Sequence, residues 1–145
     1  MDAIRRLVEA AVVGAPLARL LGVESVALER DRALLRLPFR PELTTLGDLV
    51  HGGALAALVD VAATAACWCS EDLPAGARGT TIGFSIQYLE GARGGDVTAE
   101  ARVIRRGSSI VFCEVGVAAA DGTPCARANV TYKLSAARPR AQAAA

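Results

Sequence analysis

A single carboxylate, Asp60, lies inside an otherwise almost wholly apolar run, HGGALAALVDVAATAACWC, which extends from His51 to Cys69. The run has the character of one helix, and Asp is a poor residue for a helix interior. A buried carboxylate without a partner is also costly. Asp60 therefore either has a structural partner on a wetter side of the helix, such as a backbone amide or an Arg, or acts as a nucleophile or general base.

The residues His51-Gly52-Gly53 open this helix. Glycines at a helix entry let another group approach the backbone closely, and the first-turn amides have no partner within the helix. Such N–H groups, with the helix dipole behind them, attract a carbonyl oxygen that gains negative charge. The same two glycines would equally suit a tight turn from loop to helix, so both interpretations stay open at this point.

The spacing of these two features predicts a dimer. Gly52 and Asp60 are eight residues apart, which is about 12 Å along one helix. One copy of the chain therefore cannot bring both groups to the same carbonyl. If two copies packed their central helices antiparallel about a two-fold axis, Asp60 of one copy could face Gly52 of the other.

Composition narrows the class of protein. The 145 residues are enough for one domain with its own core, and 52% hydrophobic with 21% charged residues is an ordinary globular balance. A net charge of +1 and 4% aromatic residues give no basis for binding nucleic acid or a membrane surface. A membrane span over residues 52–69 is disfavoured, because Asp60 near its centre would cost about 2.5–3.5 kcal/mol.

The four cysteines, Cys67, Cys69, Cys113 and Cys125, match no zinc-binding spacing, so no metal site is predicted. Charged residues in the first nine positions interrupt the apolar core that a signal peptide needs. We therefore expect reduced thiols and a cytoplasmic protein.

The elements that would position Asp60 follow from periodicity. Residues 1–21 have helical spacing, broken at Gly14-Ala15-Pro16 and ended by Gly22. Residues 23–39 alternate around an RDR turn and predict a β-hairpin, and a loop rich in turn-forming residues follows. The central helix is expected to begin near Gly53 and to end between residues 70 and 74.

The second half of the chain predicts an antiparallel meander. Alternating segments follow the helix, and Asp121-Gly122 is a strong hairpin signal between the last two. The segments cover residues 80–92, 96–107, 109–122 and 123–134. A curved sheet around one apolar helix is an α+β fold, in which a second copy would cover the remaining side of the helix. We expect one domain over residues 1–134 and a flexible tail over 135–145.

The stretch VHGGALAALVDVAATAA resembles the H-G-G-x-x-x-x-x-x-D signature of the hotdog-fold thioesterases, in the PaaI-like group of the 4-hydroxybenzoyl-CoA thioesterase superfamily. The resemblance extends from Leu17 to Leu134 and includes a Tyr-Leu, a Gly-Asp, a basic-Gly turn and a final D-G-x-x-x-A hairpin. It implies the hotdog fold, a long helix wrapped by an antiparallel sheet. It also implies a homodimer, often paired into a homotetramer.

The resemblance assigns roles to single residues. Asp60 falls on the catalytic carboxylate, which acts as nucleophile or as general base on a water. Gly52 falls on the residue whose amide polarises the thioester carbonyl, with Gly53 in the substrate site and His51 in a supporting role. Thr81 falls where relatives hold a Ser or Thr that orients the water.

The resemblance also implies a coenzyme A site at Arg105, Arg106, Gly107 and Ser108, since this turn in relatives touches the phosphates. The charge and forked donors of Arg suit phosphate oxygens.

The loop before His51 departs from the family pattern. Relatives have an Asn six residues before the His and a Gly three before it, whereas this chain has Thr45 and, four before, Gly47. Thr44, Thr45 or Asp48 could take the place of the Asn, and none is assigned.

The implied function is that of an acyl-CoA thioesterase, which hydrolyses a thioester to a carboxylic acid and free coenzyme A. Coenzyme A is part of the substrate, so no separate cofactor is expected. The alternatives are a non-catalytic hotdog protein that binds or senses acyl-CoA, a hotdog hydratase, and a purely structural oligomer module. A binder does not need Asp60, and a hydratase uses an Asp and His in a different motif. The residues do not identify the acyl group.

Overall fold

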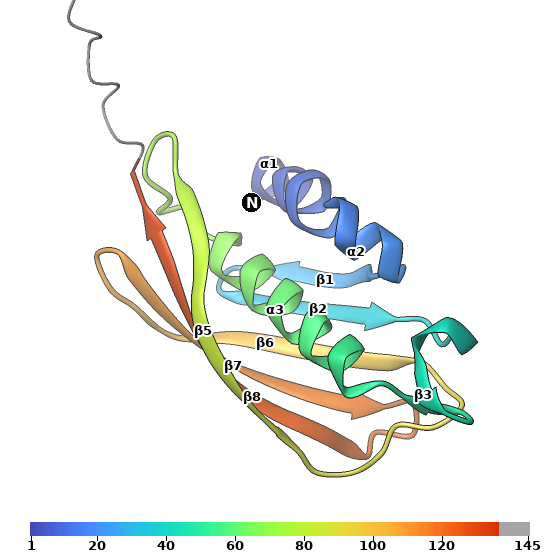
Figure 1. Cartoon of the computed structure of the whole chain (residues 1–145). Coiled ribbons are helices and arrows are strands. Elements are labelled where there is room, and N and C mark those ends of the chain that lie inside the picture. Colours follow the sequence, from blue (N-terminus) through green and yellow to red (C-terminus); the bar gives the residue numbers. More distant parts are fainter. Residues whose placement is uncertain (137–145) are drawn as a thin grey trace, which may run out of the picture.

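The sheet is built from six strands that pair only with antiparallel neighbours, in the order β1-β2-β6-β7-β8-β5. The computed structural model describes residues 1–136 (Figure 1). The strands are β1 (Glu24–Glu29), β2 (Arg32–Leu37), β5 (Arg78–Tyr88), β6 (Val97–Arg106), β7 (Ile110–Ala119) and β8 (Pro124–Ser135). The predicted hairpin and meander are confirmed, with Gly122 in the left-handed turn (φ 86°) between β7 and β8.

Helix α3 (Gly52–Trp68) lies across the concave face of this sheet (Figure 1). Its Leu, Val, Ala and Cys side chains form the centre of the core: Ala54, Leu55, Leu58, Val59, Ala62, Ala63, Ala65, Ala66 and Cys67 are buried. The predicted α+β fold, a long helix wrapped by an antiparallel sheet, is therefore confirmed. Within residues 1–136, no helix combines the length and hydropathy needed to cross a membrane.

The predicted C-terminal end of the helix is wrong by at least two residues, since α3 stops at Trp68. Cys69 leaves the helical conformation with φ −77° and ψ 66°. Its carbonyl then accepts a hydrogen bond from the Asp31 backbone N–H at 2.8 Å. This hydrogen bond fixes the chain after Trp68 to the β1–β2 turn, so the helix does not continue.

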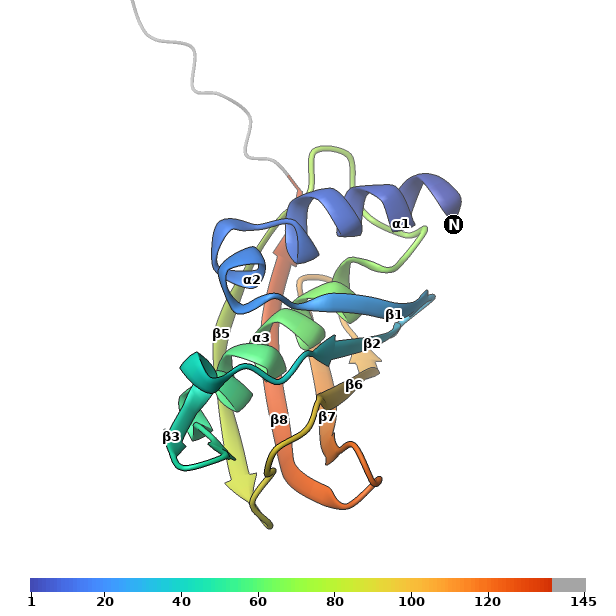
Figure 2. The ribbon, with the colours of Figure 1, turned by 90° about the vertical axis from the view of Figure 1, so that its right-hand side faces the viewer.

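The N-terminal segment is helical, as predicted. It consists of α1 (Asp2–Val8), a π-helical turn η1 (Glu9–Val13) and α2 (Pro16–Leu21). Pro16 opens α2, and Gly22 ends it in the left-handed conformation (φ 76°) that a glycine adopts without strain. In both views the segment lies beside β1 and α3 (Figures 1 and 2).

Residues 40–50, predicted as a loop, instead contain regular secondary structure. They form the short helix η2 (Pro41–Leu43) and a small hairpin of β3 (Thr44–Leu46) and β4 (Leu49–Val50). The Leu43 carbonyl accepts the His51 N–H at 2.8 Å, so this hairpin fixes where α3 begins. At the other end of the chain, Ser135 is the last residue of β8. The rest of the expected tail, residues 137–145, lies outside the described residues.

Strand β5 is an edge of the sheet and carries exposed apolar side chains. Ile82, Phe84 and Tyr88 are 58%, 40% and 52% exposed. A long edge strand with free backbone groups and exposed apolar side chains is a template for pairing with another chain. Asp60 and Thr64 of α3, which are half-buried, face this same region.

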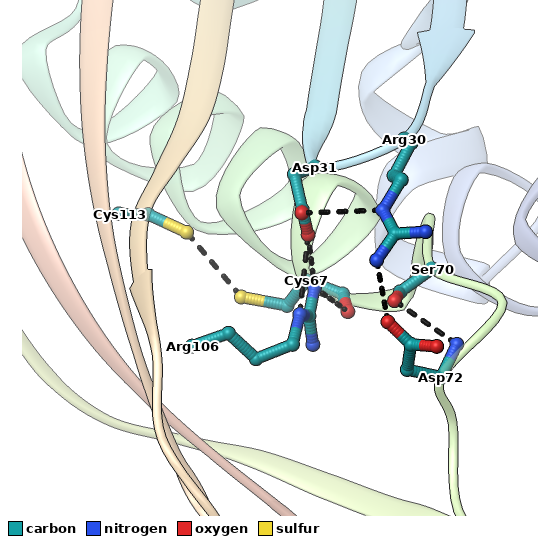
Figure 3. A network of polar contacts seen from close by, with 7 residues as sticks. All are labelled: Arg30, Asp31, Cys67, Ser70, Asp72, Arg106 and Cys113. Carbon is teal, nitrogen blue, oxygen red and sulfur yellow. Dashed lines mark hydrogen bonds and ion pairs between the residues drawn. The ribbon is translucent and has the colours of Figure 1, made fainter.

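A polar network holds the C-terminal end of α3 against the β1–β2 turn (Figure 3). Arg106, at the end of β6, forms an ion pair with Asp31 and donates to the Cys67 carbonyl at 3.1 Å. Its side chain is only 19% exposed. Cys67 and Cys113 lie 3.4 Å apart (Sγ–Sγ) beside this network, and both are free thiols. One guanidinium thus joins a strand, a turn and a helix end.

We expect Arg106→Gln to lower the free energy of unfolding by about 1–3 kcal/mol, because the Asp31 carboxylate and the Cys67 carbonyl lose a charged donor. The matched control is Arg105→Gln, since the neighbouring Arg105 is exposed and makes no side-chain hydrogen bond within residues 1–136. Its effect should be about 0.5 kcal/mol or less. Denaturant unfolding of both variants at one protein concentration measures this, and equal losses would contradict the assignment.

Candidate active site

Asp60 is held by a neutral hydroxyl and not by a cation. Thr81 Oγ1 donates a hydrogen bond to Asp60 Oδ1 at 2.6 Å. No Arg or Lys forms an ion pair with Asp60 in the described part of the chain, and no other side-chain hydrogen bond reaches its carboxylate there. The structural partners expected as the alternative, a backbone amide or an Arg, are thus not found within residues 1–136, and Oδ2 is left for other chemistry.

Strand β5 presents Thr81 to Asp60 through a bulge. The β5–β8 register shifts between Thr81 and Gly83, so Ile82 is the extra residue. A bulge bends a strand locally and re-aims the neighbouring side chains. The sequence predicted Thr81 near the carboxylate only through the family resemblance, because alternation alone does not reveal a bulge.

His51 is the N-cap of α3. Its backbone is extended, with φ −64° and ψ 134°, and its Nδ1 accepts the Gly53 N–H at 2.8 Å. A neutral imidazole that accepts at Nδ1 carries its proton on Nε2, which leaves Nε2–H as a donor. His51 therefore occupies one first-turn amide of the helix, and that amide belongs to Gly53.

Tyr88, at the end of β5, completes the arrangement around Gly52. The Tyr88 hydroxyl donates to the Gly52 carbonyl at 2.7 Å. A Cβ on Gly52 would lie 3.2 Å from Tyr88 Cζ, which is tighter than most real contacts. The Gly52–Gly53 peptide is therefore held at its carbonyl by Tyr88 and at its N–H by His51.

The N–H of Gly52 itself has no acceptor within residues 1–136. It is the first residue of α3, so no carbonyl of the helix can reach it. A fixed, unpaired amide at a helix N-terminus suits an oxygen atom with developing negative charge. The sequence predicted no role for Tyr88, although this residue belongs to the Tyr-Leu pair of the family resemblance.

The polar residues before His51 are partly engaged elsewhere. Thr44 Oγ1 donates to the Pro41 carbonyl at 2.7 Å, and Asp48 pairs with Arg93 at 3.2 Å. Thr45 is exposed and lines a pocket of about 320 Å³ with Gly52 and Tyr88.

The predicted coenzyme A residues lie where β6 ends and turns into β7, near the C-terminal end of α3: Arg105 and Arg106 end β6, and Gly107 and Ser108 belong to the turn. Arg105 is exposed, whereas the guanidinium of Arg106 is engaged by Asp31. Gly107 donates its N–H to the Ile110 carbonyl at 2.8 Å, and a Cβ there would lie 3.0 Å from that oxygen. Ser108 is exposed in the same turn.

The predicted residues thus form three groups: Asp60 with Thr81, residues 51–53, and residues 105–108. One copy does not bring the first two groups together, because both lie on α3 with Gly52 and Asp60 eight residues apart.

Comparison with known proteins gives a consistent family. The "Thioesterase superfamily" profile matches residues 47–126. The chain is 30% identical over 149 residues to the medium/long-chain acyl-CoA thioesterase YigI of Salmonella typhimurium, covering 92% of this chain and 94% of that protein. A thioesterase family protein from Silicibacter pomeroyi superposes with a TM-score of 0.85 at 21% identity, covering 92% of this chain and 99% of the other.

The PaaI protein of the phenylacetic acid degradation operon of E. coli superposes with a TM-score of 0.80 at 18% identity, covering 90% of this chain and 91% of that one. At these identities the superpositions show a shared fold, and the matched profile and the YigI relative show the family. The chain belongs to the thioesterase superfamily and has its hotdog fold, which supports thioester hydrolysis as its general reaction.

Proposed function

We propose that the chain hydrolyses acyl-CoA thioesters to a carboxylic acid and free coenzyme A, at a site shared by two copies. The observation that carries this proposal is the pair of unsatisfied groups: the free N–H of Gly52 and the Asp60 carboxylate, which is held only by Thr81 within residues 1–136. The relative YigI, named for medium- and long-chain acyl-CoA esters, supports coenzyme A as the leaving group. We place the protein in the cytoplasm.

The proposed second copy pairs along β5 and turns its α3 toward the α3 of the first. The exposed apolar side chains on β5 and the half-covered side of α3 support this arrangement. Asp60 of one copy then faces Gly52 of the other, and a dimer holds two such sites. The site is incomplete in one copy, and pairing of dimers into a homotetramer would leave it unchanged.

In the proposed reaction, the Gly52 N–H and the helix dipole stabilise the thioester oxygen as negative charge develops on it. Thr81 occupies Oδ1 of Asp60, so Oδ2 is the reacting atom. Oδ2 either attacks the carbonyl carbon to form an anhydride that water cleaves, or removes a proton from an attacking water. On both routes the C–S bond breaks, and coenzyme A leaves as a thiolate that then takes a proton.

We expect Gly52→Pro to lower kcat by about 10²–10³-fold, the effect of losing one oxyanion donor. Proline is compatible with the first helical position, and it removes only an N–H that has no acceptor among the described residues. His51, with ψ 134°, already has the extended backbone that a residue before proline requires. Gly52→Ala is the matched control, because it adds the same Cβ beside Tyr88 and keeps the N–H. Equal losses in both variants would contradict the role of the amide.

Asp60→Asn should abolish turnover and leave the dimer intact. Mixed dimers test whether the site is shared: refolding Asp60→Asn chains together with Gly52→Pro chains gives mixed dimers with one intact site each. Random pairing of equal amounts should restore about a quarter of wild-type activity, since half of the dimers are mixed. If both groups acted within one copy, the mixture would stay inactive.

The proposed coenzyme A contact is the turn of residues 105–108, with Arg105 as the phosphate ligand and Arg106 as the residue that fixes the turn to α3. Arg105→Gln should raise KM for acyl-CoA about tenfold and leave kcat unchanged, since a charged hydrogen bond is lost from binding alone. Arg127→Gln, at another exposed Arg, on β8, is the control for lost charge. An unchanged KM would move the phosphate site elsewhere.

A thioester-cleavage assay separates this function from the non-catalytic alternative. Loss of thioester absorbance is the suitable readout, because it follows the bond that breaks and does not depend on the four cysteines of the chain. Saturable binding of acyl-CoA without cleavage by the wild type would favour a protein that binds or senses these esters.

A further inference from the structure

A cavity of about 220 Å³ lies between the N-terminal helical segment and α3. One wall consists of aliphatic side chains from α1 and η1, namely Leu7, Val8, Ala11 and Val12. The residues opposite are Thr64 and Trp68 of α3, Gly79 of β5 and Tyr132 of β8. The proposed hydrolysis uses none of these eight residues.

Three residues of the cavity lining are neighbours of the Asp60–Thr81 pair, each on a different element. Thr64 is four residues after Asp60 on α3, one helical turn and about 6 Å further along the same face. Gly79 is two residues before Thr81 on β5, on the same face of the strand. Tyr132 of β8 is the direct cross-strand partner of Thr81. Each element that frames the carboxylate thus continues into the cavity wall.

Three polar side chains line the cavity, those of Thr64, Trp68 and Tyr132, and two of them are hydrogen-bonded to each other. The Trp68 indole N–H donates to the Tyr132 hydroxyl oxygen at 2.7 Å. Tyr132 is 3% exposed, and burial raises its pKa above the ordinary phenol value, so the phenol stays neutral. None of the described residues that line the cavity has a charged side chain.

Gly79 makes room for this aromatic pair. A Cβ there would lie 2.3 Å from the Tyr132 hydroxyl oxygen, which no side chain can tolerate without displacing the ring. The wall therefore consists mainly of two aromatic rings and four aliphatic side chains, together with Gly79 and the side chain of Thr64. A hydroxyl or carboxylate on a ligand would lose its water there, and the described lining offers it the Thr64 and Tyr132 hydroxyls as partners but no cation for a carboxylate.

We propose that this cavity binds the hydrocarbon end of the acyl group, so that the preferred substrates are CoA esters of unsubstituted aliphatic acids of medium length. The inference rests on the proposed function and adds its substrate class. A cavity of 220 Å³ is smaller than the roughly 300–1,000 Å³ of pockets for drug-sized ligands, which fits one such chain. The pocket beside Gly52 is also largely apolar, but its lining includes the carboxylate of Glu90, whereas the lining residues of the cavity are all uncharged.

Two variants change the cavity in opposite directions. Ala11→Phe fills it and should lower kcat/KM for octanoyl-CoA at least about tenfold relative to butyryl-CoA. Leu7→Ala enlarges it and should shift the preference toward dodecanoyl-CoA. Leu7 is already 45% exposed, so this truncation has little effect on folding. Ala3→Phe is the control, because it adds the same ring to α1 at an exposed position outside the cavity lining.

The kinetic outcomes distinguish the two proposals. If the wild type cleaves esters but both cavity variants keep its chain-length profile, the cavity assignment is overturned and the proposed function stands. If the wild type cleaves no ester of the series, the proposed function fails, and the acyl-site assignment fails with it. Preference for 3-hydroxyoctanoyl-CoA or adipoyl-CoA over octanoyl-CoA would also overturn the hydrocarbon assignment.

Trp68 gives a second readout that does not depend on turnover, because it is the only tryptophan of the chain. In the Asp60→Asn variant, octanoyl-CoA should change Trp68 fluorescence, whereas acetyl-CoA and free coenzyme A should not. Adding Ala11→Phe should remove the octanoyl response. The same response to free coenzyme A, or none to octanoyl-CoA at concentrations that saturate binding, would place the acyl chain elsewhere.

Discussion

Helix α3 is covered by the sheet on one side only, and the rest of the molecule follows from that constraint. Nine of its residues are buried, and α3 contacts both the strands of the sheet and the N-terminal helical segment. On the uncovered side the helix carries small or polar residues, among them Asp60 and Thr64, which are half-buried. The free-energy cost of placing a carboxylate there is small, because the group keeps partial solvation and one hydroxyl partner, Thr81. The same carboxylate on the opposite face would face buried Leu and Val side chains.

The beginning of α3 shows how a helix N-terminus becomes a site with one donor. A helix leaves its first amides without partners. In α3 the Gly53 amide has an acceptor outside the helix, and the Gly52 amide has none within residues 1–136. His51 occupies the Gly53 amide, and Tyr88 fixes the carbonyl of the same peptide. Gly52 alone keeps an N–H without an acceptor within residues 1–136. Fixing the neighbouring peptide matters because a donor that is already oriented needs no reorganisation when charge develops.

Local patterns predicted what depends on local physics. The apolar run after His51 predicted α3, strand alternation predicted the meander, and Asp121-Gly122 predicted the last turn. Two contacts were beyond such patterns. The Arg106–Asp31 ion pair joins residues 75 apart, and the Tyr88–Gly52 hydrogen bond joins residues 36 apart. Periodicity carries no information on which distant polar groups meet, so Arg106 was assigned only as a phosphate ligand.

The short hairpin before His51 was missed for a related reason. Its strands are three and two residues long, too short for alternation to be visible. Its position is set by distant backbone hydrogen bonds, such as the one from Val50 N–H to the Ala92 carbonyl at 2.9 Å. The family resemblance placed an Asn in this region, and the chain has no equivalent at that spacing.

The arrangement of α3 and β5 also links the proposed chemistry to substrate choice. Helix α3 carries Asp60 and strand β5 carries its partner Thr81. Both elements also contribute residues to the lining of the cavity under the N-terminal helical segment. A substitution in the N-terminal helical segment alters the shape of the cavity. It leaves Asp60 and Thr81 in place, because their hydrogen bond joins α3 to β5 and involves no residue of that segment. Acyl preference can therefore vary through α1 and η1 while the reacting groups stay fixed. Exposed positions such as Leu7 and Ala11 can change with little effect on the core, and they are the positions at which such variation would occur.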